Sequence, residues 1–205
     1  IVLDTETTGT DPEADQIIEL GMVCFEFVPA TGEIVWVTDV YDSLEDPGRP
    51  IPPESTQIHG ITDEMVAGHR IDDEAVAEML EGVTWVVAHN AAFDRKFWQA
   101  ELARAGLPAQ QAFACTLLVS RRLYPQSPNH KLGTLVDFHH LQRTGAAHRA
   151  LADAEMTVEL LHQIQHDLRQ RHHVAKPDHG LLMALQRCAK AAVPAFMRSQ
   201  SVVPA

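Results

Sequence analysis

Two carboxylates stand one residue apart in the segment DTETTG, residues 4–9, directly after the apolar run IVL. The apolar run is rich in β-branched residues and predicts a buried strand. Side chains two positions apart on a strand share a face, so we expect Asp4 and Glu6 to lie side by side. Burial strengthens the repulsion between two such anions unless a cation lies between them. The pair therefore favours a cation site, with exposed carboxylates at a strand end as the simple alternative.

The size and charge of the chain limit the classes of protein to consider. Its 205 residues suit one domain, with room for a small appendage. The net charge is −12, but residues 1–82 carry −18 and residues 83–205 carry +6, so a basic half remains for a polyanionic partner. No apolar stretch has the length of a membrane span, and we expect no membrane partner. Three widely spaced cysteines argue against a disulfide framework and favour the reducing cytoplasm.

Hydrophobic periodicity predicts a mixed α/β protein in which strands come first and helices then alternate with strands. Residues 16–28 and 32–41 are predicted to form an antiparallel pair that continues from the first strand, and the Pro-rich residues 43–55 a loop. A short strand is expected at 83–88. Helices are expected at 72–82, 90–106 with Asn90 as N-cap, 115–125, 131–141, 148–171 and 179–197, the last broken near Pro194.

Two further carboxylates stand where strands end and helices begin, which is where open α/β sheets assemble their sites. They are Asp94, one turn after Asn90, and Asp153, five residues after His148. Together with Asp4 and Glu6 they form an all-oxygen donor set, which favours two Mg²⁺ or Mn²⁺ ions over structural zinc. His148 has the pKa range of a general base for an attacking water. Singly, the two acids could instead serve helix dipoles, and His148 is one of twelve histidines.

Three segments in this order resemble the motifs of the DEDDh 3′-to-5′ exonucleases, and most of all the proofreading exonucleases of bacterial DNA polymerase III. They are DTETTG (4–9), HNAAFD (89–94) and HRALADA (148–154). A fourth, IHGITDEMV (58–66), is similar to a substrate-contacting segment of the same group. The resemblance covers residues 1 to about 168. It implies an RNase H-like fold with a five-stranded mixed sheet flanked by helices.

The resemblance also implies roles for individual residues. Asp4, Glu6 and Asp153 would bind the catalytic ion, Asp4 would bridge to a second ion, and Asp94 would complete the set, often through water. His148 matches the general base. The residues expected to contact the terminal nucleotide are Asp4, Glu6, Thr7, Glu54, His59, Asn90 and Phe93. Phe93 could stack on a base, although packing against Phe97 in the core is an equal alternative.

The implied function is stepwise hydrolysis of single-stranded DNA from its 3′ end, releasing nucleoside 5′-monophosphates. A 3′-to-5′ exoribonuclease, a noncatalytic nucleic-acid-binding module and a phosphoesterase for small nucleotides remain as alternatives. We expect an exonuclease domain at 1–168 and a helical extension at 169–205 that packs on the domain or contacts a polymerase subunit. Candidates for a groove that follows the strand are Arg95, Lys96, Arg104, Arg121, Arg122, Lys131 and Arg149.

Overall fold

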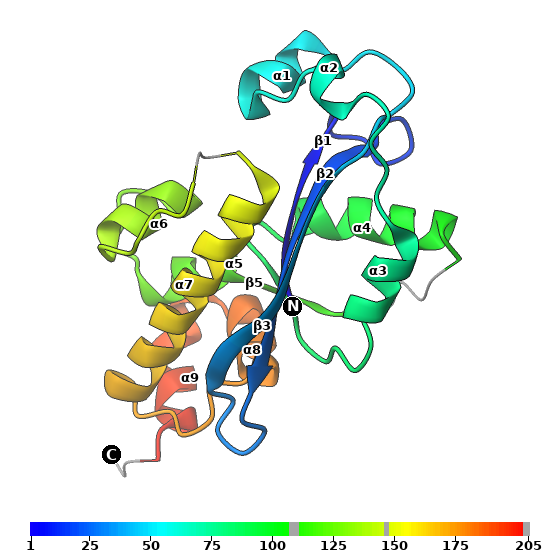
Figure 1. Ribbon diagram of the computed structural model, residues 1–205. Coiled ribbons are helices and arrows are strands. Elements are labelled where there is room, and N and C mark those ends of the chain that lie inside the picture. Colours follow the sequence, from blue (N-terminus) through cyan, green and yellow to red (C-terminus); the bar gives the residue numbers. More distant parts are fainter. Residues whose placement is uncertain (107–110, 146–147, 203–205) are drawn as a thin grey trace.

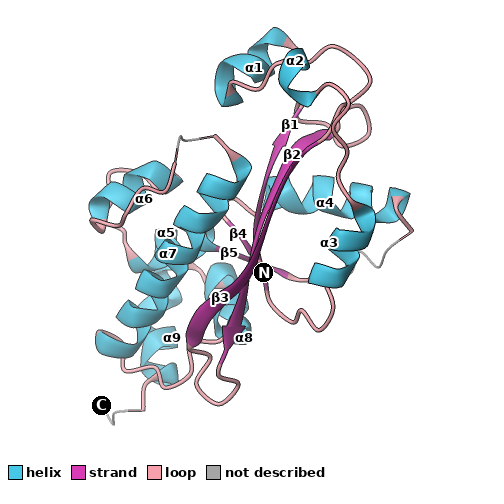
Figure 2. Cartoon of the chain, viewed as in Figure 1, coloured by secondary structure: helices cyan, strands magenta, loops and turns pink. Residues whose placement is uncertain are grey.

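A five-stranded sheet forms the centre of the computed structural model, which describes residues 1–106, 111–145 and 148–202 (Figures 1 and 2). The strand order is β3-β2-β1-β4-β5. β1 pairs antiparallel with β2 and parallel with β4, so the mixed sheet that the sequence predicts is confirmed. The strands are β1 (Val2–Thr7), β2 (Ile17–Phe27), β3 (Ile34–Leu44), β4 (Val86–Ala88) and β5 (Phe113–Cys115).

Helices cover both faces of the sheet. In Figure 1, α3 and α4 lie on one side, α5 to α9 lie on the other, and α1 and α2 stand beyond the ends of β1 and β2. The described helices are α1 (Pro53–His59), α2 (Asp63–Val66), α3 (Asp73–Met79), α4 (Ala92–Arg104), α5 (Thr116–Leu123), α6 (Leu132–Phe138), α7 (Ala150–Gln170), α8 (His179–Arg187) and α9 (Val193–Gln200). None of them is long and apolar enough to cross a membrane.

Alternation along β1 divides the core into two halves. Val2 packs in the cluster that contains Leu160 and Leu161 of α7, whereas Leu3 packs in the cluster that contains Phe97 of α4. Even-numbered side chains of β1 therefore face α7, and odd-numbered side chains face α4. This alternation assigns Asp4 and Glu6 to the α7 face and Thr5 to the α4 face.

The C-terminal segment belongs to the α7 half of the core. Leu182 and Leu185 of α8 and Met197 of α9 are buried in the same cluster as the apolar face of α7. The sequence predicts one helix over 179–197 that breaks near Pro194, and the structure corrects this. Two α-helices, α8 and α9, are present with the short 3-10 helix η1 (Lys190–Ala192) between them. Pro194 lies in the first turn of α9, where its missing N–H leaves no intrahelical bond unmade.

Two other segments differ from the sequence prediction. The Pro-rich loop predicted for 43–55 is shorter, because β3 continues to Leu44 and α1 begins at Pro53. Asn90 is not the N-cap of the following helix, since α4 begins at Ala92 and Asn90 has a left-handed backbone with φ of 65°. β5 was not located from the sequence because three residues are too few to carry a recognisable periodicity.

α7 reaches the sheet through a glycine. Gly21 lies opposite Asp4 in the β1–β2 pairing, on the face that α7 covers. A Cβ at this position would lie 2.2 Å from the backbone nitrogen of Leu151 and 2.3 Å from the carbonyl carbon of Ala150. The first turn of α7 therefore lies directly on the backbone of β2.

Gly21→Ala is expected to lower the free energy of unfolding by about 1–3 kcal/mol, because the added methyl group meets backbone atoms that cannot rotate away. Thermal unfolding measures the effect. The matched control is Gly133→Ala in α6, where the nearest atom would lie 3.5 Å away at the tip of Arg143. Equal melting temperatures for the two variants would contradict the close approach of α7 to β2.

Candidate active site

Asp4 and Glu6 lie together on the α7 face of β1, where alternation along the strand places them. Neither carboxylate makes a hydrogen bond or ion pair with another part of the chain that the structure describes. The two side chains are half-buried. Such acceptors, close together and without donors, are unfavourable in a folded protein unless a ligand completes them.

Asp94 reaches the same strand from the opposite face of the sheet. It lies in the first turn of α4, is 3% exposed, and its Oδ1 accepts hydrogen bonds from the backbone nitrogen of Thr5 at 3.1 Å and from the hydroxyl of Thr5 at 2.9 Å. Thr5 stands between Asp4 and Glu6, so these bonds fix the third carboxylate at the same end of β1. The described bonds thus join Asp94 to the residue between Asp4 and Glu6, and its place in a shared ion site stays a prediction.

His148 and Asp153 come from the start of α7. The backbone N–H of His148 donates to Oδ2 of Asp153 at 3.2 Å, and the imidazole is exposed. Ligand atoms of Glu6, His148 and Asp153 all lie within 4.8 Å of one another. Side chains separated by more than 140 positions in the sequence therefore meet at one point.

Burial and, after it, mutual repulsion act on the carboxylates of the cluster. Burial, followed by the charges of Asp94 and Asp153, raises the pKa of Asp4 well above its ordinary value. Burial and the charge of Asp153 raise the pKa of Glu6 from 4.5 to about 8. Burial raises the pKa of Asp94 to about 7 in spite of its bonds from Thr5, and burial also raises the pKa of Asp153. Since each carboxylate resists ionisation next to the others, the set has the character of a cation site.

His59 lies beside this cluster, next to the backbone of Thr7. It is 6% exposed, and its Nδ1 accepts the backbone N–H of Ile61 at 3.0 Å, so the proton of the neutral ring is on Nε2. The Nε2 atom is buried. Burial lowers the pKa of His59, and this outweighs the opposing effect of a hydrogen bond with the backbone of Thr7, so the neutral form is favoured.

The other predicted substrate contacts differ in their accessibility. Glu54 and Asn90 are exposed, and Thr7 is buried with its hydroxyl donating to the carbonyl of Gly9 at 2.6 Å. Phe93 is half-buried and lies against Phe97, with ring centroids 5.2 Å apart. Part of the Phe93 ring is thus already in the core, and the rest remains accessible.

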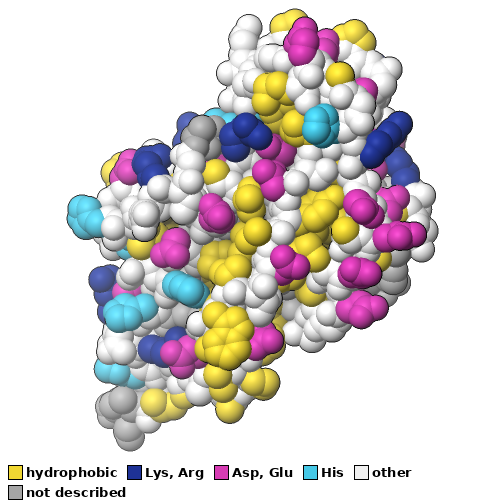
Figure 3. Space-filling view, in the orientation of Figure 1, with side chains coloured by type: hydrophobic (Ala, Val, Ile, Leu, Met, Phe, Trp, Pro, Cys, Tyr) yellow, Lys and Arg dark blue, Asp and Glu magenta, His cyan; other side chains and the backbone are white. Residues whose placement is uncertain are grey.

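Several of the predicted groove cations already have partners within the chain. Lys96 donates to the carbonyl of Thr10, Arg104 pairs with Glu101, and Arg122 donates to the carbonyls of Leu118 and Cys188. These bonds reduce the number of side-chain cations that are available to bind a nucleic-acid strand. In Figure 3, acidic side chains gather over α3 and α4, and Lys and Arg lie mainly on the side of α6 and α7.

Glu19 is a residue of this site that sequence reasoning missed. Its side chain is 1% exposed, and it lies opposite Glu6 in the β1–β2 pairing. It forms an ion pair with Arg149, N···O 2.6 Å, so Arg149 is not a free cation of the groove. A lone acid within the otherwise apolar strand QIIELGMV was the available signal.

The cavity between α3 and α4 does not coincide with the cluster of carboxylates. A cavity of about 500 Å³ lies between α3 and α4, with Val76, Trp98 and Leu102 among its lining residues. It is on the α4 side of the sheet and contains none of the converging carboxylates. The candidate active site is therefore defined by chemistry at the end of β1.

Comparisons with known proteins agree with this geometry. The family model described as "Exonuclease" matches residues 1–161. The chain is 36% identical over 176 residues to the PolC-type DNA polymerase III of Listeria monocytogenes, a match that covers 84% of this chain and 12% of the relative. The corresponding polymerase of Thermotoga maritima is 37% identical over 169 residues, covering 78% and 11%. The chain thus spans about one-eighth of the length of these curated relatives.

Solved structures share the fold. Exonuclease X in complex with 5′ overhanging duplex DNA is 32% identical, with a TM-score of 0.60 over 80% of this chain and 90% of that chain. The zinc-bound complex of Escherichia coli ExoI with single-stranded DNA is 17% identical, with a TM-score of 0.64 over 83% and 40%. The five-stranded mixed sheet and its flanking helices thus have the RNase H-like architecture expected from the sequence. By its sequence and its fold, the chain belongs to the exonuclease family.

Proposed function

We propose that this chain is a metal-dependent 3′-to-5′ exonuclease that hydrolyses single-stranded DNA from its 3′ end and releases nucleoside 5′-monophosphates. The observation that carries the proposal is the meeting of Glu6, His148 and Asp153 within 4.8 Å, with Asp4 and Asp94 at the same end of β1. Carboxylates beside an accessible imidazole are the groups that phosphodiester hydrolysis requires.

The donor set fits divalent cations. Asp4, Glu6, Asp94 and Asp153 would hold two ions, Mg²⁺ or Mn²⁺, because these hard cations prefer oxygen ligands. Asp4 and Glu6 have no hydrogen-bond donors among the described residues, and burial, followed by the charges of neighbouring acids, raises the pKa of each carboxylate. A bound cation would offset both effects. When bound, such ions supply an activated water and stabilise the leaving oxygen of a phosphate ester.

The remaining residues have proposed roles in proton transfer and substrate binding. His148 accepts the proton of the attacking water, since its exposed imidazole lies beside Glu6 and Asp153. His59 donates its Nε2–H to the terminal nucleotide. Thr7, Glu54, Asn90 and Phe93 complete the contacts, with the accessible part of the Phe93 ring stacking on a base.

DNA is the proposed substrate because the 32% identical Exonuclease X is a DNA-bound structure and the curated relatives are DNA polymerases. Their names also suggest that the chain acts in proofreading beside a polymerase. The domain would comprise residues 1–168. The extension at 169–205 buries Leu182, Leu185 and Met197 against α7, so a polymerase subunit would contact its exposed side chains.

Asp4→Asn is expected to abolish hydrolysis of a 5′-labelled single-stranded DNA oligomer, because it removes a metal-binding charge at the centre of the cluster. His148→Ala is expected to slow hydrolysis by about 10²- to 10⁴-fold, the usual contribution of a general base. EDTA is expected to stop the wild-type reaction. Denaturing electrophoresis measures the ladder of shortened products, and Asp39→Asn, an exposed acid on β3, is the matched control.

The same assay separates the alternatives. Faster decay of an RNA oligomer of equal sequence would identify an exoribonuclease. Hydrolysis of mononucleotide esters without oligomer shortening would identify a small-nucleotide phosphoesterase. Oligomer binding by the wild type without hydrolysis in Mg²⁺ or Mn²⁺ would identify a noncatalytic module and overturn the proposal.

In EDTA, the wild-type chain is expected to lose more stability than Glu6→Gln as the pH rises. The folded-state pKa of Glu6, about 8, lies above its ordinary value of 4.5. Its protonated form is favoured by folding, so its contribution is fully present below pH 4.5 and is lost as the pH rises through about 8. The measurement is the melting temperature of both proteins from pH 5 to 9.

Adding Mg²⁺ or Mn²⁺ at the upper end of this range is expected to raise the melting temperature of the wild type more than that of Glu6→Gln. The reason is that the ion binds the ionised carboxylate in the folded state alone. Parallel pH curves for the two proteins in EDTA, with equal responses to the metal, would contradict the proposed role of Glu6 as a ligand.

A further inference from the structure

Glu19 adds a buried charge next to the proposed catalytic residues, and the proposed chemistry does not use it. Its side chain is 1% exposed and stands opposite Glu6 on the neighbouring strand, on the face that α7 covers. A carboxylate in this position increases the local repulsion, and burial without compensation would be costly. The groups that bind Glu19 must therefore offset the cost of burying its charge.

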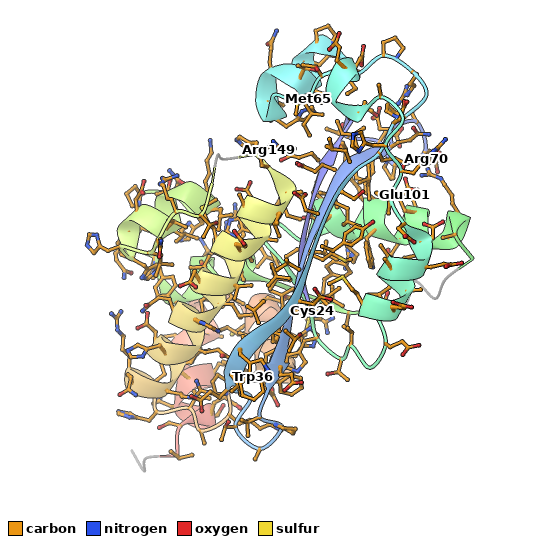
Figure 4. The ribbon with its side chains drawn as sticks, in the orientation of Figure 1. Cys24, Trp36, Met65, Arg70, Glu101 and Arg149 are labelled. Atoms are coloured by element: carbon orange, nitrogen blue, oxygen red, sulfur yellow. The ribbon has the colours of Figure 1, made fainter. Side chains whose placement is uncertain are left out.

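Both oxygens of Glu19 bind the start of α7. Oε1 accepts from Nε of Arg149 at 2.8 Å and from Nη2 of Arg149 at 2.6 Å. Oε2 accepts the backbone N–H of Ala150, the first residue of the helix, at 2.9 Å. Because no side chain of α7 itself caps this end, a carboxylate from β2 satisfies a backbone donor that the helix leaves unpaired. Figure 4 labels Arg149 at this end of α7, beside the sheet.

His148 is the residue directly before this contact. Its backbone is left-handed, with φ of 61°, and its N–H donates to Asp153. Residues other than glycine are uncommon in this region, and histidine enters it more often than most, as His140 and His173 also do in this chain. The chain around His148 is fixed on the helix side by Glu19, which binds the next two residues, and by the close approach of α7 to Gly21.

We propose that Glu19 and Arg149 are positioning residues, which fix the start of α7 on β2 so that the imidazole of His148 stays beside Glu6 and Asp153. The inference rests on the proposed function, in which His148 is the general base. Arg149 thus acts through Glu19 and His148, and its guanidinium does not bind the nucleic acid. The position of a general base relative to the attacking water is critical, because displacing the base by about 1 Å can lower the rate about 10²-fold.

Glu19→Gln tests this inference, because the amide retains the size of the side chain and loses its charge. We expect kcat for 3′-end hydrolysis to fall by about 10- to 100-fold while KM changes little, since the imidazole is misplaced and the strand-binding groups are not. Arg149→Lys, which keeps the charge and loses the two-nitrogen contact, is the second variant and is expected to show the same division.

Glu45→Gln is the matched control. Glu45 also pairs with an arginine, Arg70, at 2.5 Å, and also accepts the backbone N–H of the following residue, Ile71, at 2.6 Å. This pair lies beside α3, away from α7, and Figure 4 labels Arg70 there. The control removes a similar set of bonds, and we expect it to leave kcat and KM unchanged.

A double-mutant cycle identifies the residue through which the pair acts. In a His148→Ala background, Glu19→Gln and Arg149→Lys are expected to cause no further loss of kcat, because the group that they position is gone. If Arg149 instead binds the nucleic-acid strand, the loss of kcat caused by each variant persists in the His148→Ala background. The affinity of each variant for a DNA oligomer in Ca²⁺, measured by fluorescence anisotropy, then falls as well. Either result would overturn the inference.

A readout without substrate or metal separates this inference from the proposed function. In NMR spectra of the metal-free chain, the imidazole Cε1–H signal of His148 is expected to shift or broaden in Glu19→Gln. It should stay unchanged in Glu45→Gln, with the exposed His173 at the far end of α7 as reference. An unmoved His148 signal in Glu19→Gln overturns the positioning role even if the enzyme is active. A moved signal in a chain that hydrolyses no DNA supports that role and removes the proposed function.

Discussion

Repulsion among buried carboxylates is the constraint on which the arrangement of this molecule depends. Three of the acids at the end of the sheet have donors of their own: Asp94 has those of Thr5, Asp153 has the N–H of His148, and Glu19 has Arg149. Asp4 and Glu6 have none among the residues that the structure describes. The negative charge that the fold leaves without a donor is thus concentrated on Asp4 and Glu6. The same pair predicts a cation site from the sequence.

The sheet provides the means by which these groups meet. Alternation along β1 directs Asp4 and Glu6 to one face and Thr5 to the other, so a single strand of six residues binds both α4 and α7. α4 contributes Asp94 from one side, and α7 contributes Asp153 from the other. α8 and α9 pack against α7 in the same core cluster and so help to hold that helix in place. The site consequently depends on both halves of the core, not on one motif alone.

The sequence predicted the parts of this site that follow from local pattern. The strand before Asp4, the helix after Asp94 and the long helix after His148 each have a clear hydrophobic period, and the mixed sheet followed from their order. Contacts between residues far apart in the chain do not follow from local sequence pattern. The sequence pattern places Glu19 within a predicted strand, Arg149 among the groove cations and Asn90 at an N-cap, whereas the actual partners and conformation of each are set by tertiary packing. The bond between Glu19 and Arg149 joins residues 130 positions apart, a separation that no local pattern reports.

The left-handed backbones of Asn90 and His148 also affect how the protein balances stability against activity. Residues other than glycine in this region carry backbone strain, which is smallest for asparagine and histidine, and the folded state bears it whether or not substrate is present. Substitution by glycine would relax that strain and remove the side chain in the same step. Under the proposed function, a glycine at His148 or Asn90 would exchange a side chain of the site for lower backbone strain, whereas His140 and His173, which share this conformation, have no proposed role.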